Sequence, residues 1–116
     1  EQYRGWNGIV GDHNYNWHDA IHSGGGGSCG VNSTSPCDDH NHGTHTIGTI
    51  CGDDLLGNQI GMAPSAKWIG ARNMNVGAGT PTTYNECFQW FLAPTNIAGQ
   101  NPMPSKAPHV INNSWG

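Results

Sequence analysis

Apolar residues recur with helical spacing in only two stretches of this sequence, residues 42–51 and residues 83–92. In residues 42–51 the apolar positions share one helical face, and Gly52 follows them, as is typical of a helix end. Residues 83–92 show the same spacing and precede Pro94, which cannot continue a helix. The chain is therefore predicted to contain two helices, and any strands must come from the segments around them.

The first predicted helix contains two internal glycines, Gly43 and Gly48. Each of them costs a helix up to about 1 kcal/mol relative to alanine. A helix that keeps such glycines usually has another part of the backbone packed closely against it. We therefore expect this helix to be buried.

Two segments around the second predicted helix have the pattern of strands. Residues 66–72 follow a turn, and residues 109–113 contain an apolar pair. The order strand, helix, strand predicts a βαβ unit with parallel strands and a right-handed crossover. Between the first strand and the helix, residues 73–80 form a glycine-rich loop. The predicted fold class is α/β, with a mostly parallel sheet flanked by helices.

Residues 1–41 show no regular pattern and are expected to form a long irregular segment. The chain is 34% hydrophobic and 10% charged, with 18 glycines and five tryptophans among its 116 residues. This composition suits a loop-rich globular protein, because disordered chains are usually highly charged and poor in aromatic residues. We interpret residues 1–116 as a fragment of one domain, cut at both ends from a longer protein, with the helix and the βαβ unit in residues 42–116.

Charge and hydropathy argue against two classes of partner. The net charge is −4, and the four basic residues form no cluster that could neutralise several phosphates, so no nucleic-acid partner is expected. No apolar run approaches the roughly 20 residues that a membrane-spanning helix needs, so no membrane partner is expected either.

The four cysteines fall into two pairs of different character. Cys29 and Cys37 flank a loop of turn-forming residues, so a disulfide that closes this loop is predicted, with two free thiols as the alternative. A disulfide favours an oxidising compartment, and we expect a secreted protein. Cys51 and Cys87 lie in the periodic stretches, where each is either a buried small hydrophobe or the partner of a cysteine elsewhere.

The predicted topology brings three segments to one edge of the sheet. In open parallel sheets, sites form beyond the carboxyl ends of the strands. The loops at residues 73–80 and 114–116 leave the predicted strands at that edge, and a helix that crosses back begins there. His42, at the start of the first helix, is therefore expected beside these two loops. This convergence predicts a functional site.

His42 suits the role of a general base. The helix dipole disfavours a protonated imidazole at a helix N-terminus, and a base must be neutral before it acts. The alternative is a metal site, because His42 and His45 share a helix face and the chain has seven histidines. However, a zinc helix of the H-E-x-x-H type has glutamate where residue 43 is glycine. We predict a catalytic base and keep a His-rich metal-binding module as the alternative.

Three blocks of the sequence resemble, in order, those of the subtilisin-like serine proteases, the subtilases. Residues 39–49 resemble the histidine block, residues 61–66 the G-V-A-P-x-A turn, and residues 110–116 the V-I-N-x-S-x-G strand. Residues 1–6 and 14–17 are also similar to the bacillopeptidase F-like members. The resemblance implies a partial, subtilisin-like catalytic domain of a serine endopeptidase that cleaves peptide bonds with an Asp-His-Ser triad.

By position, the resemblance implies that His42 is the triad base and that His45 is a structural residue of the same helix. It also implies a cleft with two walls for a polypeptide substrate, one of which pairs with the substrate as an added strand. Trp115 stands where the family commonly has leucine, so its bulk is expected to alter the adjoining pockets. The pairing wall is Ser114, Trp115 and Gly116, and the opposite wall is Gly77, Ala78 and Gly79.

The rest of the catalytic machinery is expected outside this chain. The sequence contains no G-T-S-x-A block for the nucleophile, and the oxyanion asparagine would follow the last residue. The catalytic aspartate is expected upstream, with Asp12 as an alternative, and Asp38 and Asp39 are expected to be turn or capping residues. The chain alone is predicted to be inactive and to need the remainder of the parent catalytic domain. A non-catalytic pseudoprotease that serves as an interaction domain is the alternative.

This chemistry requires no cofactor, but a structural calcium ion is one hypothesis. Many family members bind calcium in the loop after the histidine helix. In this chain that loop is residues 52–59, where Asp53, Asp54 and Asn58 offer hard oxygen ligands. The alternative is a solvated surface turn.

Overall fold

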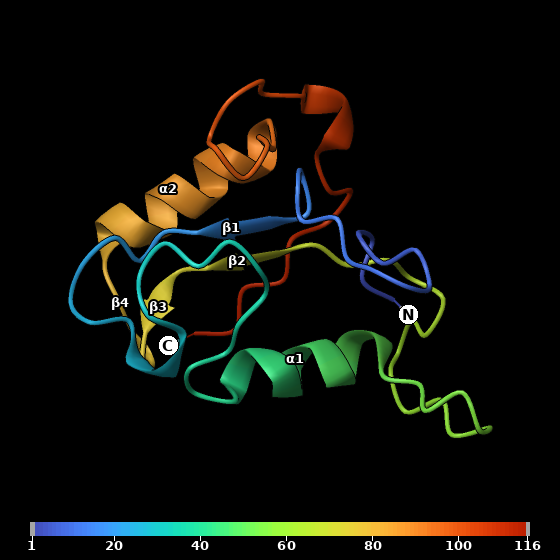
Figure 1. The fold of residues 1–116 in the computed structure, drawn as a ribbon. Helices are drawn as coiled ribbons and strands as arrows, with labels where there is room; N and C mark the ends of the chain where they lie inside the picture. The colour runs from blue at the N-terminus through green and yellow to red at the C-terminus, as the bar shows by residue number, and fades with distance from the viewer. Residues whose placement is uncertain (1, 116) are drawn as a thin grey trace.

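The computed structural model describes residues 2–115, in which helices flank a small parallel sheet (Figure 1). None of the helices in these residues has the length and apolar character that a membrane span needs. The elements are strand β1 (Trp17–Asp19), helix α1 (His42–Cys51), strands β2 (Gly70–Arg72), β3 (Met74–Asn75) and β4 (Ala78–Gly79), and helix α2 (Pro81–Leu92), with 3-10 turns at Gly27–Cys29 and Pro104–Lys106.

The parallel sheet is formed by β1 and β2, with Trp17 opposite Gly70 and Asp19 opposite Arg72. Because α1 lies between these strands in sequence, the chain contains a βαβ unit, but it is not the predicted one. β1 lies within the segment that was expected to be irregular, and the predicted strand at 66–72 forms only at its carboxyl end. β1 was not predicted because it contains a buried aspartate, Asp19. Its ion-pair partner, Arg72, is distant in sequence and is brought close only by the fold.

The strand predicted at residues 109–113 is not formed. Val110 is 85% exposed and Ile111 is 41% exposed. An apolar strand is stable only where neighbours cover its side chains, and the described part of the chain supplies none for Val110. The α/β class is correct. However, the described sheets are one parallel and one antiparallel pair, so the prediction of a mostly parallel sheet is not confirmed.

The glycine-rich loop at residues 73–80 forms a tight hairpin of β3 and β4, with Met74 opposite Gly79. Its turn residues, Val76 and Gly77, have φ values of 48° and 80°. Positive φ at both turn positions matches the twist of a two-residue hairpin. Glycine adopts this conformation freely, whereas a β-branched residue such as Val76 rarely does.

The N-terminus of α1 is capped from outside the helix. The N-cap residue Asn41 is left-handed, with φ 63°, and makes no side-chain capping bond. Asp38 takes that role, because its Oδ2 accepts the Thr44 backbone N–H at 2.7 Å and the Thr44 hydroxyl at 2.6 Å. The prediction that Asp38 is a capping residue is therefore confirmed.

The C-terminus of α1 is closed by the turn that follows it in sequence. Backbone N–H groups of Gly61, Met62 and Ala63 donate to the carbonyl oxygens of Gly52, Thr49 and Ile50 at 2.8, 3.1 and 2.7 Å. These bonds satisfy carbonyl groups that a helix end leaves without partners. Gly61 is required here, because a Cβ atom at this position would overlap the backbone at the end of the helix.

The burial expected for α1 is wrong for the described residues. Cys51 is its only buried residue, and no atom lies within 4 Å of a Cβ atom built on Gly48. In Figure 1 the helix stands apart from both sheets. The glycines therefore have no close backbone neighbour in this part of the protein.

Helix α2 begins at Pro81, two residues before the predicted start, because a capping box precedes it. The Thr83 backbone N–H donates to Thr80 Oγ1 at 3.2 Å, and the Thr80 N–H donates to Thr83 Oγ1 at 3.0 Å. Proline at the first helical position needs no hydrogen-bond partner for its nitrogen. The buried residues of α2 are Cys87 and Trp90, and the helix packs against β1.

A buried ion pair connects the two strands of the parallel sheet. Arg72 Nε and Nη2 donate to the two carboxylate oxygens of Asp19 at 3.0 and 2.8 Å, and both side chains are almost fully buried. Arg72 Nη1 also donates to the Gly26 carbonyl oxygen at 3.2 Å and lies 3.5 Å from Asp39 Oδ2. One guanidinium thus contacts β1, the loop around Gly26 and the segment before α1, while it belongs to β2 itself.

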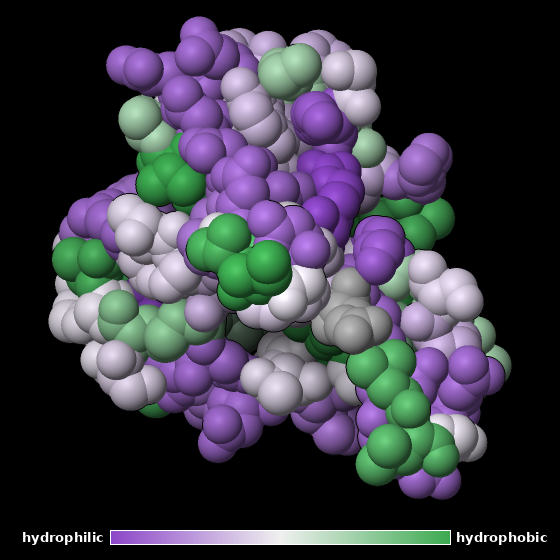
Figure 2. Space-filling model, turned by 45° about the vertical axis from the view of Figure 1, so that its right-hand side comes forward, coloured by the Kyte–Doolittle hydropathy of each residue, from purple (hydrophilic) through white to green (hydrophobic). Residues whose placement is uncertain are grey.

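The core of the described residues is small, and many apolar side chains remain on the surface. Figure 2 shows separate hydrophobic groups on one face of the molecule. Leu56, Ile60 and Met62, in the loop after α1, are 88, 80 and 87% exposed. The buried apolar residues with side chains larger than glycine's are Trp17, Ala20, Ile21, Cys51, Cys87, Trp90 and Pro94.

The structure joins Cys29 and Cys37 in a disulfide and leaves Cys51 and Cys87 as buried free thiols. Burial raises the pKa of both thiols. For Cys87, the nearby negative charges of Glu86 and Asp19 add to burial and raise the pKa to about 12. The thiolate, which is the reactive form, is therefore scarce at both positions.

Replacing Asp19 with alanine is expected to lower the free energy of unfolding by about 3 kcal/mol, because it leaves the buried Arg72 guanidinium with a weaker partner. Urea unfolding of the full-length protein measures this change. Asp12→Ala, at an exposed aspartate, is the control and should change the free energy by less than about 1 kcal/mol. Equal effects of the two substitutions would contradict the importance of the buried pair.

Cys51 and Cys87 are expected to resist alkylation in the native protein at pH 8, because both thiols are buried and protonated. Peptide mapping by mass spectrometry after iodoacetamide treatment tests this. In denaturant without reductant, both should become alkylated while Cys29 and Cys37 stay linked. Rapid native labelling of Cys87 would show that its burial is wrong.

Candidate active site

A cavity of about 1150 Å³ lies between α1, the parallel sheet and α2. The carboxyl-terminal segment, red in Figure 1, runs between β2 and α1 and lines the same cavity. Most predicted site residues border it, namely His42, Gly77, Ser114 and Trp115, whereas Ala78 and Gly79 do not. Gly116 lies outside the described residues.

His42 is the first residue of α1 and is exposed toward this cavity. Its position follows from the cap. Asp38 accepts hydrogen bonds from the Thr44 N–H, in the first turn of the helix, at 2.7 Å and from the His40 N–H at 3.0 Å. Partial burial raises the pKa of Asp38, but hydrogen bonds from the Thr44 hydroxyl and from the backbone N–H groups of His40, Thr44 and Asn41 outweigh this effect. The pKa of Asp38 is therefore below its ordinary value, and the cap remains ionised at neutral pH.

The segment that leads into His42 contacts the β3–β4 hairpin directly. Asp39 Oδ2 accepts the Val76 backbone N–H at 3.0 Å. A Cβ atom built on Gly77 would lie 3.0 Å from the His40 ring, so this imidazole packs against the glycine. The hairpin that carries one predicted wall is thus attached to the residues immediately before the predicted base.

Tyr84, in the first turn of α2, lies between the two predicted walls. Its ring stacks on Trp115 with centroids 4.5 Å apart and an interplanar angle of 7°, and a Cβ atom on Gly79 would overlap the same ring. Phe88 contacts Trp115 edge-on at 6.1 Å. The sequence interpretation missed Tyr84, although an aromatic residue four positions after the helix cap Thr80 was a visible signal.

The described part of the predicted pairing wall, Ser114 and Trp115, belongs to no helix or strand. The Asn112 side-chain amide donates to Ser114 Oγ at 2.8 Å, so the Ser114 hydroxyl is engaged within the segment. Trp115 is 40% exposed even though it stacks on Tyr84. The wall is therefore anchored to α2 through an aromatic side chain.

The model of the subtilase family of peptidases matches residues 14–116. The chain belongs to the subtilase family. It is 42% identical over 120 aligned positions to bacillopeptidase F of Bacillus subtilis (strain 168), an alignment that covers all of this chain and 8% of that protein. No solved structure gives a significant match. The resemblance inferred from the three sequence blocks is confirmed, and the chain spans only a small part of its relative.

The two histidines of the subtilase motif have different surroundings. His42 lines the large cavity, whereas His45 is exposed and does not. Among residues 2–115, no group of three or more His, Cys, Asp or Glu side chains is arranged to hold a metal ion. The described geometry thus gives no support to the alternative of a His-rich metal-binding module.

The structure does not bring Asp12 to the cavity of His42. Asp12 is exposed, and its Oδ1 accepts the backbone N–H and the side-chain amide of Asn14, both at 3.0 Å. This geometry is an Asx turn, which is common at surface loops. The place of the triad acid outside this chain stays a prediction.

The carboxylates proposed as calcium ligands bind donors of their own loop. Asp53 Oδ1 accepts the Leu55 N–H at 2.7 Å, and Asp54 Oδ1 accepts the Leu56 and Asn58 N–H groups at 2.8 and 3.0 Å. The side-chain amide of Asn58 donates to Asp54 Oδ2 at 2.6 Å. This is the geometry of a self-supporting turn, and calcium binding at this loop stays a prediction.

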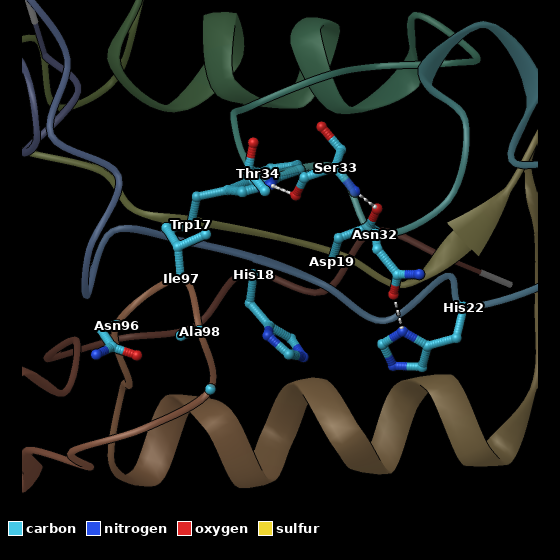
Figure 3. Close-up of a pocket in the computed structure, with 11 residues that line it drawn as sticks. Trp17, His18, Asp19, His22, Asn32, Ser33, Thr34, Asn96, Ile97 and Ala98 are labelled. Carbon is cyan, nitrogen blue, oxygen red and sulfur yellow. Dashed lines mark hydrogen bonds between the residues drawn. The ribbon is translucent and has the colours of Figure 1, made fainter.

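A second, smaller cavity of about 210 Å³ lies between β1, the loop near residue 33 and the loop at residues 96–99. Figure 3 shows the rings of His18 and His22 directed from β1 and its continuation toward α2. Both Nε2 atoms lie 2.8 Å from Glu86 Oε1 on α2. His22 Nδ1 lies 2.5 Å from Asn32 Oδ1, so both ring nitrogens of His22 face acceptors. The hydrogen bond with Asn32, and then the one with Glu86, raise the pKa of His22.

Protonated His22 is expected to stabilise the fold at acidic pH. Because its pKa is raised above the ordinary histidine value of about 6.5, the stabilisation is complete below about pH 6.5 and is lost as the pH rises through the folded-state pKa. The difference in unfolding free energy between wild type and His22→Gln should thus be larger at pH 5.5 than at pH 8.5. It should stay below about 1 kcal/mol, since half of the side chain is exposed.

Glu86→Gln provides the control for this measurement, because it removes the carboxylate that His18 and His22 share. In that background the His22→Gln difference should depend less on pH, because the Glu86 contribution is lost while the hydrogen bond with Asn32 remains. A difference that grows with pH in the wild-type background would contradict the assignment of a protonated His22.

Proposed function

We propose that this chain supplies the histidine and part of the substrate cleft of a subtilisin-like serine endopeptidase. The observation that carries the proposal is that His42, Gly77, Ser114 and Trp115, from three separate segments of a subtilase sequence, border one cavity. A base beside two chain segments is the arrangement that cleavage of an extended polypeptide requires.

In the proposed reaction His42 acts first as a base and then as an acid. It accepts the proton of a serine hydroxyl supplied by another part of the protein, as the serine oxygen attacks the carbonyl carbon of the peptide. It then donates this proton to the leaving amine, and an acyl-enzyme remains. Water attacks the acyl-enzyme with His42 again as the base, which releases the acid and restores the serine. The triad aspartate is also expected outside this chain.

The substrate is proposed to bind in an extended conformation. Backbone groups of Ser114, Trp115 and Gly116 pair with it as an added strand, and Gly77, Ala78 and Gly79 form the facing wall. The stacking of Trp115 on Tyr84 supports this proposal, because it holds the pairing segment against a helix.

The proposed partner of this chain is the remainder of the catalytic domain, without which we expect no activity. The support is physical, because the cavity beside His42 has apolar side chains on its lining, such as Ile47 and Ile50 of α1 and the exposed Val110. Uncovered apolar surface of this extent commonly marks an interface. The disulfide between Cys29 and Cys37 supports a secreted protein.

His42→Ala in the full-length protein is expected to reduce kcat for peptide hydrolysis by about 10⁴- to 10⁶-fold, since triad residues act as a unit. Hydrolysis of a chromogenic peptide amide, followed under steady-state conditions, measures this. His45→Ala is the matched control, because His45 lies on the same helix without lining the cavity, and it should retain most of the activity.

Two results would count against the proposal. Undiminished cleavage by His42→Ala would exclude this residue as the base. An inactive wild type, from a reading frame without a G-T-S-x-A block, would favour a pseudoprotease that serves as an interaction domain.

A further inference from the structure

We propose that Asp39 is a positioning residue that fixes the hairpin wall of the cleft relative to His42. This inference rests on the proposed function, because it assigns a role in binding an extended substrate. It concerns a residue that does not belong to the triad and is not expected to touch the substrate. The argument starts from the two consecutive aspartates that precede His42.

Asp38 and Asp39 hold the same short segment from opposite directions. Asp38 binds forward, to Thr44 in the first turn of α1. Asp39 binds the hairpin, through the Val76 N–H at 3.0 Å. Because His42 lies three residues beyond Asp39, the distance from the imidazole to the hairpin depends on this second bond. The sequence predicted turn or capping roles for both aspartates, and the capping role applies to Asp38.

The bond from Asp39 reaches the hairpin at its most strained point. Val76 has a φ of 48°, a conformation that a β-branched residue rarely adopts. Such strain persists only where surrounding interactions hold it in place. The hydrogen bond from the Val76 N–H to a carboxylate is one of those interactions, and the next residue is Gly77, the part of the wall that lines the cavity.

Asp39 is itself held in a fixed position. Its side chain is 5% exposed, and Oδ2 lies 3.5 Å from Nη1 of the buried Arg72. A Cβ atom built on Gly27 would come within 3.0 Å of Asp39 Cβ, so the chain passes close on that side as well. Because this carboxylate has little freedom to move, it can hold both the hairpin and the segment of His42 in fixed positions relative to β2.

The experiment compares Asp39→Ala, Asp39→Asn and Asp38→Ala in the full-length protein with two substrates. One is a peptide amide long enough to extend along the hairpin wall, and the other is a single-residue ester that ends at the reacting carbonyl. Active-site titration with an acylating reagent counts only the folded, competent molecules. Steady-state kinetics then give kcat and KM for each substrate.

For Asp39→Ala we expect KM for the long peptide to rise about three- to tenfold, consistent with the loss of part of one hydrogen bond to a charged group, with kcat changed less than about twofold. KM for the short ester should not change. Asp39→Asn should restore the wild-type ratio of the two KM values, because its amide oxygen still accepts the Val76 N–H. Asp38→Ala should leave that ratio unchanged, since Asp38 does not touch the hairpin.

Several outcomes would overturn the assignment. These are equal changes in both KM values, a loss confined to kcat, or an Asp39→Asn variant as impaired as Asp39→Ala. An Asp39→Ala protein that does not fold would assign Asp39 a purely structural role. His42→Ala, measured in parallel, separates the two proposals: full activity in that variant removes the proposed function, whereas a required His42 with an unchanged KM ratio in Asp39→Ala removes only this inference.

Discussion

The structure depends on one buried guanidinium, that of Arg72 at the end of β2. Burying a charge away from water is unfavourable unless it is paired and hydrogen-bonded. Asp19 provides a bidentate partner from the neighbouring strand, and Asp39 adds a second carboxylate. The pair also disfavours a shift in the register of the sheet. Shifting β1 by one residue would turn Asp19 to the other face of the sheet and take it away from Arg72. The pair therefore specifies both the pairing of the strands and the approach of the chain to α1.

The helices could be predicted from the sequence because their signals are local. The apolar spacing and the flanking Gly52 and Pro94 located α1 and α2 to within two residues. Of the two strands in the parallel sheet, β2 was predicted in part within residues 66–72, but β1 could not be, because it owes its burial to a charge pair with a residue 53 positions away. The reverse error occurred at residues 109–113, where an apolar pattern was taken for a strand but no strand among residues 2–115 covers Val110. Periodicity reports which residues can be buried, but the partners that bury them are a property of the fold.

The candidate site shows the same division between local and long-range information. His42 and the segments at 77–79 and 114–116 could be located from family blocks, since each block is contiguous in sequence. The contacts made by Tyr84 and Asp39 could not, because each of them connects two such segments, although Asp39 itself lies in the histidine block. Tyr84 touches both walls, and Asp39 joins the histidine segment to the hairpin. Residues whose role is to fix the relative position of motifs leave little trace in any one motif.

The exposure of α1 bears on how its histidine is held. The helix has two internal glycines and little burial, so neither propensity nor packing within the described residues accounts for its stability. What remains are its two ends, where Asp38 binds the first turn and the backbone of residues 61–63 binds the last carbonyl groups. Thr44 and residues 61–63 belong to sequence blocks that resemble the family, so these blocks stabilise the helix as well as carry the predicted base. If the remainder of the domain covers the apolar part of the cavity lining, as proposed, less water surrounds His42, and electrostatic interactions with the imidazole become stronger. Because hydrogen bonds hold both ends of the helix, it can place His42 beside the cavity without support from the rest of the site.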